Sequence, residues 1–150
     1  MRFRQVKDIL EWTREFHSLI AQRLGQTSGN SERAKLLLEY FSDHEERLAY
    51  VVARFEEDAD AGLLNSWFQD VTEFDELPST EELNERLKNA DENEVVKLVV
   101  HCHDQIIAAY KALLNESDIE SVSDILSNLV QLEENEKMLL VRDSQYFQDV

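Results

Sequence analysis

The fold is decided by residues 36–49, which read LLLEYFSDHEERLA. Leu37, Phe41 and Leu48 are spaced there by four and seven residues, which places them on one face of an α-helix. Only three glycines and one proline interrupt the 150 residues, too few for the many turns of an all-β domain. Because the same periodicity recurs elsewhere, the sequence predicts an all-α fold with four long helices, over residues 4–24, 31–57, 93–114 and 119–147.

Two of the three connections between these helices are short. The residues GQTSGN at 25–30 form the first turn, and NESDIES at 115–121 form the last. We expect the first helix to end at Gly25, because glycine suits the position just after a helix. Asn30 or Ser31 is expected to cap the second helix.

The middle connection, about 58–92, is different in length. It is too long for a turn between neighbouring bundle helices, but it suits a crossover along the bundle. After Pro78 it contains a stretch typical of a short helix, with Ser79 or Thr80 as the cap. The prediction is therefore a single domain over residues 1–150, built from two helical hairpins joined by a long crossover that contains a short helix.

The charge distribution excludes several classes of partner. The net charge is −17, and residues 55–94 hold fourteen acidic side chains against two basic ones. Such a field repels phosphate backbones and anionic lipids, so we expect no nucleic acid and no membrane as partners. It attracts cations or a basic protein partner, and it is also typical of a simply solvated surface. A homo-oligomer is left open.

The cellular location is predicted from what the sequence lacks. The single cysteine, Cys102, cannot form a disulfide within the chain, which favours a reducing compartment. No stretch approaches the roughly 18 consecutive apolar residues of a membrane span, and the N-terminal residues do not resemble a signal peptide. We therefore expect a cytoplasmic protein.

Five polar side chains share the apolar faces of the predicted helices, and these are the candidate site residues: His17, His44, His103, Glu133 and Glu136. His17 lies between Thr13 and Ile20 on the first helix, and His44 lies between Phe41 and Leu48 on the second. His101, in contrast, points outward. The five residues are predicted to converge in one polar cluster at the middle of the bundle.

Buried carboxylates require a compensating charge, since burying them alone costs several kcal/mol. Three imidazoles and a cation would supply it, and a nitrogen and oxygen ligand set suits Fe, Mn or Zn. A metal ion is therefore the candidate cofactor. Two alternatives stay open: a layer of histidine–glutamate hydrogen bonds without metal that fixes the helix register, and an error in the assumed helix phase.

The two halves of the chain resemble each other weakly. Aligning residues 16–24 with residues 102–110 superposes His17 on His103. A shift of 92 residues places Phe41 on Glu133 and His44 on Glu136. Both a duplicated hairpin and a chance likeness between amphipathic helices are consistent with this pattern.

Residues 36–49 and the stretch LVQLEENEKMLL, at 129–140, resemble the second and fourth helices of the ferritin-like di-metal carboxylate family. The resemblance implies a ferritin-like up-down four-helix bundle. In that family one Glu comes from each of two helices and a Glu-x-x-His pair from each of the others. By position, His17 and His103 would replace the single glutamates, while Phe41-x-x-His44 and Glu133-x-x-Glu136 would replace the pairs. Because no Glu-x-x-His remains, the resemblance implies an altered or one-metal centre.

Two functions follow from these observations. The first is a metal-binding protein with a redox-active Fe or Mn site or a Zn site inside the bundle, with its status as an enzyme left open. The second is a non-catalytic helical module whose acidic segment 55–94, with Trp67, Phe68 and Phe74, binds a basic partner. Tyr110 is expected to be a core tyrosine with a hydrogen-bonded hydroxyl, or else a redox-active phenol near the metal.

Overall fold

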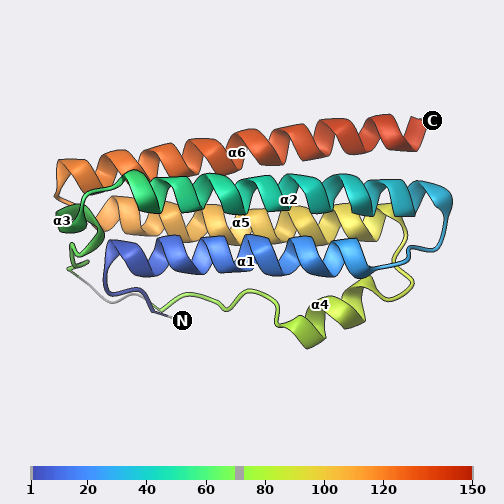
Figure 1. Ribbon diagram of the computed structural model, residues 1–150, viewed down its shortest axis with the longest axis horizontal. Helices are drawn as coiled ribbons and strands as arrows, with labels where there is room; N and C mark the ends of the chain where they lie inside the picture. Colours follow the sequence, from blue (N-terminus) through green and yellow to red (C-terminus); the bar gives the residue numbers. More distant parts are fainter. Residues whose placement is uncertain (1, 70–72, 150) are drawn as a thin grey trace.

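The structure is a computed structural model, and it describes residues 2–69 and 73–149. Four long helices account for most of the chain: α1 (Val6–Gln26), α2 (Glu32–Asp58), α5 (Glu92–Glu116) and α6 (Glu120–Asp149) (Figure 1). Two isolated β-bridges, Arg2 to Glu73 and Gln5 to Trp67, are the β-structure found within the described residues, which form no strand. The predicted all-α fold is confirmed.

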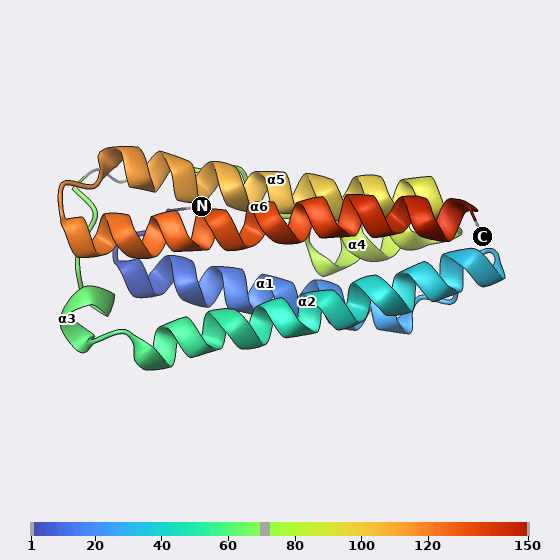
Figure 2. The ribbon, with the colours of Figure 1, turned by 90° about the horizontal axis from the view of Figure 1, so that it is seen from above.

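The long helices form two antiparallel hairpins, α1 with α2 and α5 with α6 (Figure 2). The connection from α2 to α5 runs along the length of the bundle, so α5 begins at the end where α2 begins (Figure 1). Consequently α2 and α5 run in the same direction. The connection contains two short helices, α3 (Ala61–Leu64) and α4 (Thr80–Leu87), where the sequence predicted one.

Local chemistry explains where the helices begin. The side chain of Ser31 accepts a hydrogen bond from the backbone N–H of Ala34 at the start of α2, and Ser79 accepts one from Glu82 at the start of α4. These caps settle the two alternatives that the sequence left open.

The predicted end of α1 at Gly25 is wrong. The helix continues through Gln26, and Thr27 is its C-cap. A Cβ atom on Gly25 would lie 3.0 Å from the Oγ atom of Ser42, so this glycine instead permits a close approach of α2. The glycine that adopts the left-handed conformation is Gly29, with φ of 72°.

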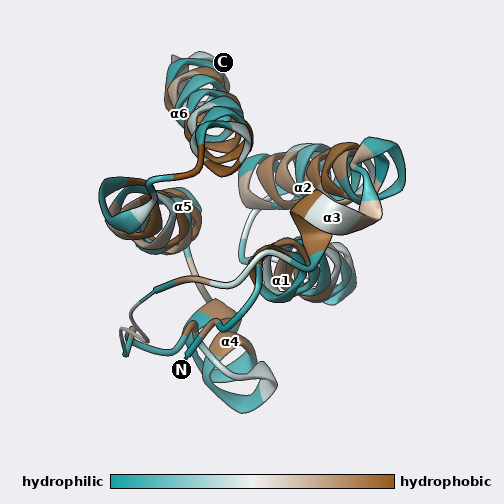
Figure 3. Ribbon diagram, turned by 90° about the vertical axis from the view of Figure 1, so that its left-hand side faces the viewer, coloured by the Kyte–Doolittle hydropathy of each residue, from teal (hydrophilic) through white to brown (hydrophobic). Residues whose placement is uncertain are grey.

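The crossover covers one side of the bundle. α4 lies under α1 and α5, and its Leu83 and Leu87 are buried against them (Figure 3). The seam between α2 and α6 lies on the opposite side of the bundle from α4 (Figure 3). The two seams between the hairpins are therefore unequal, one covered by α4 and the other facing away from it.

Among the helices of the described residues, none is both long enough and apolar enough to cross a bilayer.

Candidate metal centre

Each long helix supplies one buried histidine or glutamate to the centre of the bundle. His17 comes from α1, Glu45 from α2, His103 from α5 and Glu133 from α6. All four are buried, with 0 to 1 % of each side chain exposed. We call these four residues the buried ring, because their contacts close on themselves.

The ring alternates histidine and glutamate. His17 Nδ1 lies 2.5 Å from Glu45 Oε2, and His17 Nε2 lies 2.6 Å from Glu133 Oε1. His103 Nε2 lies 2.5 Å from Glu45 Oε1, and His103 Nδ1 lies 2.9 Å from Glu133 Oε2. Both nitrogens of each imidazole and both oxygens of each carboxylate are therefore turned toward the ring.

The four contacts follow a two-fold pattern. Each histidine approaches the glutamate of its own hairpin through Nδ1 and the glutamate of the other hairpin through Nε2. Each glutamate uses one carboxylate oxygen for the histidine of its own hairpin and the other oxygen for the histidine of the other hairpin. The ring thus treats the two hairpins as equivalent halves.

One corner of the ring is imperfect. His103 Nδ1 and Glu133 Oε2 are close, yet they lack the alignment of a hydrogen bond, and neither atom has another partner among the described residues. A buried polar atom without a well-formed hydrogen bond is costly. This corner therefore has ligand atoms available to a further binding partner.

The electrostatics of the ring favour charged side chains. Burial alone would lower the pKa of His17, but the carboxylates of Glu133 and Glu45 outweigh it and raise this pKa from 6.5 to about 9. The pKa of His103 is likewise raised, against the effect of burial, by Glu45 and Glu133. Two imidazolium rings offer four N–H donors to the four oxygens of two carboxylates, which makes the proton-filled ring electrically neutral.

The glutamates shift in the opposite sense. Burial alone would raise the pKa of Glu133, but the histidines His17 and His103 lower it from 4.5 to about 2. The pKa of Glu45 is also lowered, again against the effect of burial, by His103 and His17. Both carboxylates are therefore ionised and able to hold a cation at neutral pH.

A second hydrogen-bond chain lies beside the ring. The hydroxyl of Tyr110 donates to Thr13 Oγ1 at 2.7 Å, and Thr13 Oγ1 donates to the carbonyl of Ile9 at 2.9 Å. Tyr110 is completely buried, and burial together with the charge of Glu133 raises the pKa of its phenol well above 10. The expectation of a core tyrosine with a hydrogen-bonded hydroxyl is confirmed.

The structure brings three of the five predicted site residues together: His17, His103 and Glu133. His44 and Glu136 instead contact each other, with His44 Nδ1 3.2 Å from Glu136 Oε2, and we call them the outer pair. Their side chains are 13 % and 22 % exposed, and they join α2 to α6. The expected convergence of all five in one cluster is thus met by three of them. Whether any of the five binds metal stays a prediction.

Glu45 was missed by the sequence reasoning. It lies four residues after Phe41 and three before Leu48, which is as central on the stripe as His44, three after and four before the same residues. Spacing alone cannot choose between neighbours that both border the buried face. In the structure Glu45 is the more deeply buried of the two neighbours, with 1 % of its surface exposed.

The similarity between the two halves of the sequence contained information that points to Glu45. A shift of 88 residues, four fewer than the shift suggested above, superposes six of the eight buried positions of α2 on buried positions of α6. It carries Ala34, Leu37, Leu38, Phe41, Glu45 and Val52 onto Val122, Ile125, Leu126, Leu129, Glu133 and Leu140. The correct alignment is one helical turn away from the shift of 92, and it pairs Glu45 with Glu133.

Comparisons with known proteins agree with this architecture. No protein-family model and no curated protein matches the sequence. A solved structure from Thermotoga maritima, described as a ferritin-like diiron-carboxylate protein, superposes with a TM-score of 0.58. The match covers 94 % of this chain and 95 % of that chain, at 16 % identity. This chain has a ferritin-like fold. The predicted fold class is therefore correct, and the buried ring lies within a ferritin-like bundle.

Proposed function

We propose that this protein binds one transition-metal ion in the buried ring, through His17, Glu45, His103 and Glu133. The observation that carries the proposal is the ring itself, in which donor atoms of His17, Glu45 and His103 lie within 4.8 Å of one another. Two imidazoles and two carboxylates form a ligand set that suits Fe, Mn or Zn. The likeness to a protein described as diiron supports iron among these three.

The ring fits a metal ion by charge as well as by chemistry. Two buried glutamates carry two negative charges, which a divalent cation balances when both imidazoles are neutral. Two protons achieve the same balance in the hydrogen-bonded form, so metal and protons compete for the same nitrogens. The incomplete corner at His103 Nδ1 and Glu133 Oε2 favours an occupant that ligates these atoms.

The ligand set is too small for a carboxylate-bridged pair of metals. Such centres in ferritin-like bundles draw a glutamate from each of two helices and a Glu-x-x-His pair from each of the others. In the ring, histidines replace both single glutamates, and only Glu45 and Glu133 supply carboxylates. We therefore propose a single ion. Iron or manganese would supply one-electron redox chemistry there, and zinc would supply a non-redox charge.

Metal analysis of protein purified without chelator tests this function. We expect about one ion of Fe, Mn or Zn per chain, and a higher melting temperature when the metal-free protein receives that ion. The variant Glu133→Gln should lose the ion. The matched control is His101→Ala, which removes an exposed histidine two residues from His103. A metal-free protein whose melting temperature is unchanged by all three ions would overturn the proposal in favour of a purely hydrogen-bonded ring.

A second candidate function rests on the acidic segment 55–94. Trp67 is 64 % exposed there, as a docking residue for a basic protein partner should be. Phe68, however, is buried, and Phe74 packs on Phe3 with ring centroids 5.5 Å apart. Such a docking surface would consist of Trp67 and the surrounding carboxylates. A partner that binds wild type and not Trp67→Ala, together with an absence of stoichiometric metal, would favour this function.

A further inference from the structure

The buried ring poses an access problem for any ion. Its four side chains are at most 1 % exposed, so a cation from solution must pass between helices. The α1–α5 side is covered by α4, whose Leu83 and Leu87 are 0 % and 2 % exposed (Figure 3). The seam between α2 and α6 is not covered by α4, so we take it as the side from which a cation enters (Figure 3).

This seam has a polar half and a half whose surface is mostly apolar, which we call the apolar half. In the polar half, the outer pair joins His44 to Glu136, and the hydroxyl of Tyr40 donates to Asp143. The ring of Tyr40 lies against His44, with centroids 4.4 Å apart. Nitrogen and oxygen ligands that are partly exposed therefore line the polar half of this seam.

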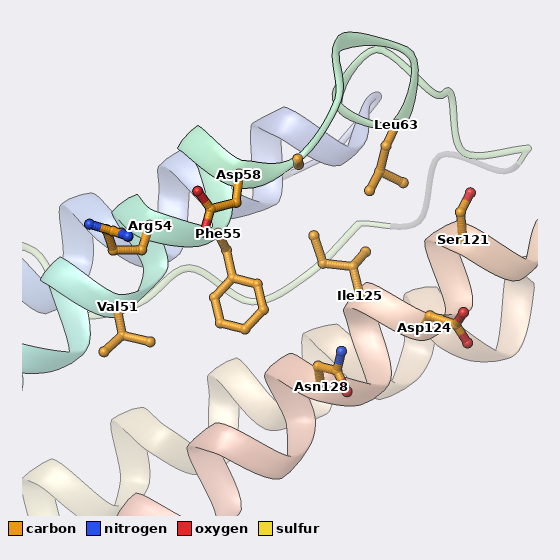
Figure 4. Close-up of a pocket in the computed structure, with 10 residues that line it drawn as sticks. Val51, Arg54, Phe55, Asp58, Leu63, Ser121, Asp124, Ile125 and Asn128 are labelled. Carbon is orange, nitrogen blue, oxygen red and sulfur yellow. The ribbon is translucent and has the colours of Figure 1, made fainter.

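In the apolar half, the seam opens into a groove of about 450 Å³ (Figure 4). Figure 4 shows Phe55 and Val51 of α2 facing Ile125 of α6 across it, and Asp58 and Asp124 also line the groove. A cation needs replacement ligands as it loses water, and these two carboxylates supply some of them. Among the described residues, however, the lining of the groove holds no histidine, whereas the outer pair offers the imidazole and carboxylate combination that the buried ring itself uses.

We propose that the outer pair, His44 and Glu136, is the access site through which a divalent metal cation reaches the buried ring. This inference rests on the proposed function of the ring. His44 is the residue before Glu45 on α2, and Glu136 lies about one helical turn after Glu133 on α6, so each member of the pair is close along its helix to one carboxylate of the ring. The cation would thus move from one imidazole and one carboxylate to a deeper set of the same ligand types.

The burial of the outer pair suits temporary binding. A partly exposed histidine–glutamate contact contributes little to stability, so a cation can replace it at small cost. The acidic character of the protein, with a net charge of −17, raises the local concentration of cations at its surface. Asp143, beside Tyr40, adds a further carboxylate to the same seam.

Loading kinetics of the full-length, metal-free protein test the inference, with Co²⁺ as the probe and its visible absorption as the signal. In the double variant His44→Ala/Glu136→Gln we expect loading to be slower by about tenfold or more. Release to a chelator should slow by the same factor, because a shared path affects both directions. The dissociation constant and the stoichiometry should therefore stay unchanged.

Two control variants isolate the path. His101→Ala/Glu134→Gln makes the same chemical changes on the surfaces of α5 and α6 away from the outer pair, and it should load as fast as wild type. Asn128→Trp fills the apolar groove and should also leave the rate unchanged. Circular dichroism checks that every variant keeps its helices.

The other outcomes of the loading experiment each contradict a specific part of the proposal. An unchanged loading rate in the double variant overturns the access site while leaving the proposed function intact. A weaker dissociation constant or a lower stoichiometry shows that the outer pair ligates the resident ion, which also overturns it. Slower loading in Asn128→Trp alone assigns the path to the groove. If wild type takes up no ion, the proposed function itself fails.

Discussion

The buried ring and the outer pair contain the same chemical groups and share the helices α2 and α6, yet they differ in burial and in closure. In the ring, four fully buried groups contact one another, with hydrogen bonds at three of the four corners, and the pKa values of its histidines are raised. In the outer pair, a single contact at 3.2 Å is partly open to solvent. The comparison teaches that a histidine–glutamate contact becomes a strong determinant of stability and ligation only where water is excluded and every polar atom faces a partner.

The largest expected difference between the two regions concerns stability. Replacing Glu133 with Ala leaves two buried imidazoles with Glu45 as their one remaining counter-charge among the described residues and should cost about 3–5 kcal/mol in unfolding free energy. Urea denaturation of the metal-free protein measures this loss, with Glu136→Ala as the control at the outer pair. Equal losses in the two variants would show that burial does not distinguish the regions.

The next effect is the pH dependence of the metal-free protein. The pKa of His17 is raised from 6.5 to about 9, so its stabilising contribution is fully present below pH 6.5 and is lost as pH rises through 9. A shift of this size corresponds to a loss on the order of 3 kcal/mol. The urea midpoint between pH 6 and pH 10, with chelator present, measures it. A flat profile would mean that the ring holds neutral imidazoles.

At acid pH, the stability of the metal-free protein should fall because the glutamates of the ring become protonated. The pKa of Glu133 is lowered from 4.5 to about 2, so its contribution is present above pH 4.5 and is lost as pH falls through 2. The ring therefore stabilises the metal-free protein most between pH 4.5 and pH 6.5.

Metal affinity should have the opposite dependence on alkaline pH. An imidazole nitrogen must release its proton before it can bind a metal, so each released proton strengthens binding by about 1.4 kcal/mol, or tenfold, per pH unit. Isothermal titration with Zn²⁺ at pH 6.5 and pH 7.5, in two buffers of different ionisation enthalpy, counts the protons. A pH-independent dissociation constant would contradict competition between metal and protons in the ring.

The smallest expected effect concerns the outer pair alone. Glu136→Gln should lower the unfolding free energy of the metal-free protein by less than about 1 kcal/mol, because the contact is partly solvated. Thermal melting at low and high salt measures it. A loss of unfolding free energy as large as that in Glu133→Ala would show that the outer pair stabilises the protein as much as the ring does, and would contradict this prediction.

Much of the fold could be predicted from the sequence because the decisive signals are local. The second helix was predicted at 31–57 and is observed at Glu32–Asp58, since Ser31 caps it by its own chemistry. The prediction that α1 ends at Gly25 was wrong because this glycine instead allows the close contact with Ser42 of α2. The residue spacing along one helix gives no information about such a tertiary contact.

The candidate site was harder to predict than the helices. His17 and His103 lie at the centre of their stripes, and the structure places them in the ring. His44 and Glu45 border the stripe of α2 from its two sides, and only the position of the other hairpin decides which of them is buried. A comparison of the two halves with the correct shift would have favoured Glu45, because it places a glutamate on a glutamate.

The two-fold pattern of the ring has a consequence for the order of folding. Two of its contacts join the hairpins, over sequence separations of 116 residues for His17 to Glu133 and 58 residues for His103 to Glu45. Neither hairpin can complete these contacts alone, so each must keep its histidine and glutamate hydrated until docking. A slip of one helical turn, about 5.4 Å, would separate atoms that must lie within hydrogen-bond distance. We therefore expect the hairpins to fold first and the contacts of the ring to form late in folding. Hairpins docked one turn out of register would lack these contacts and would be less stable than the native arrangement.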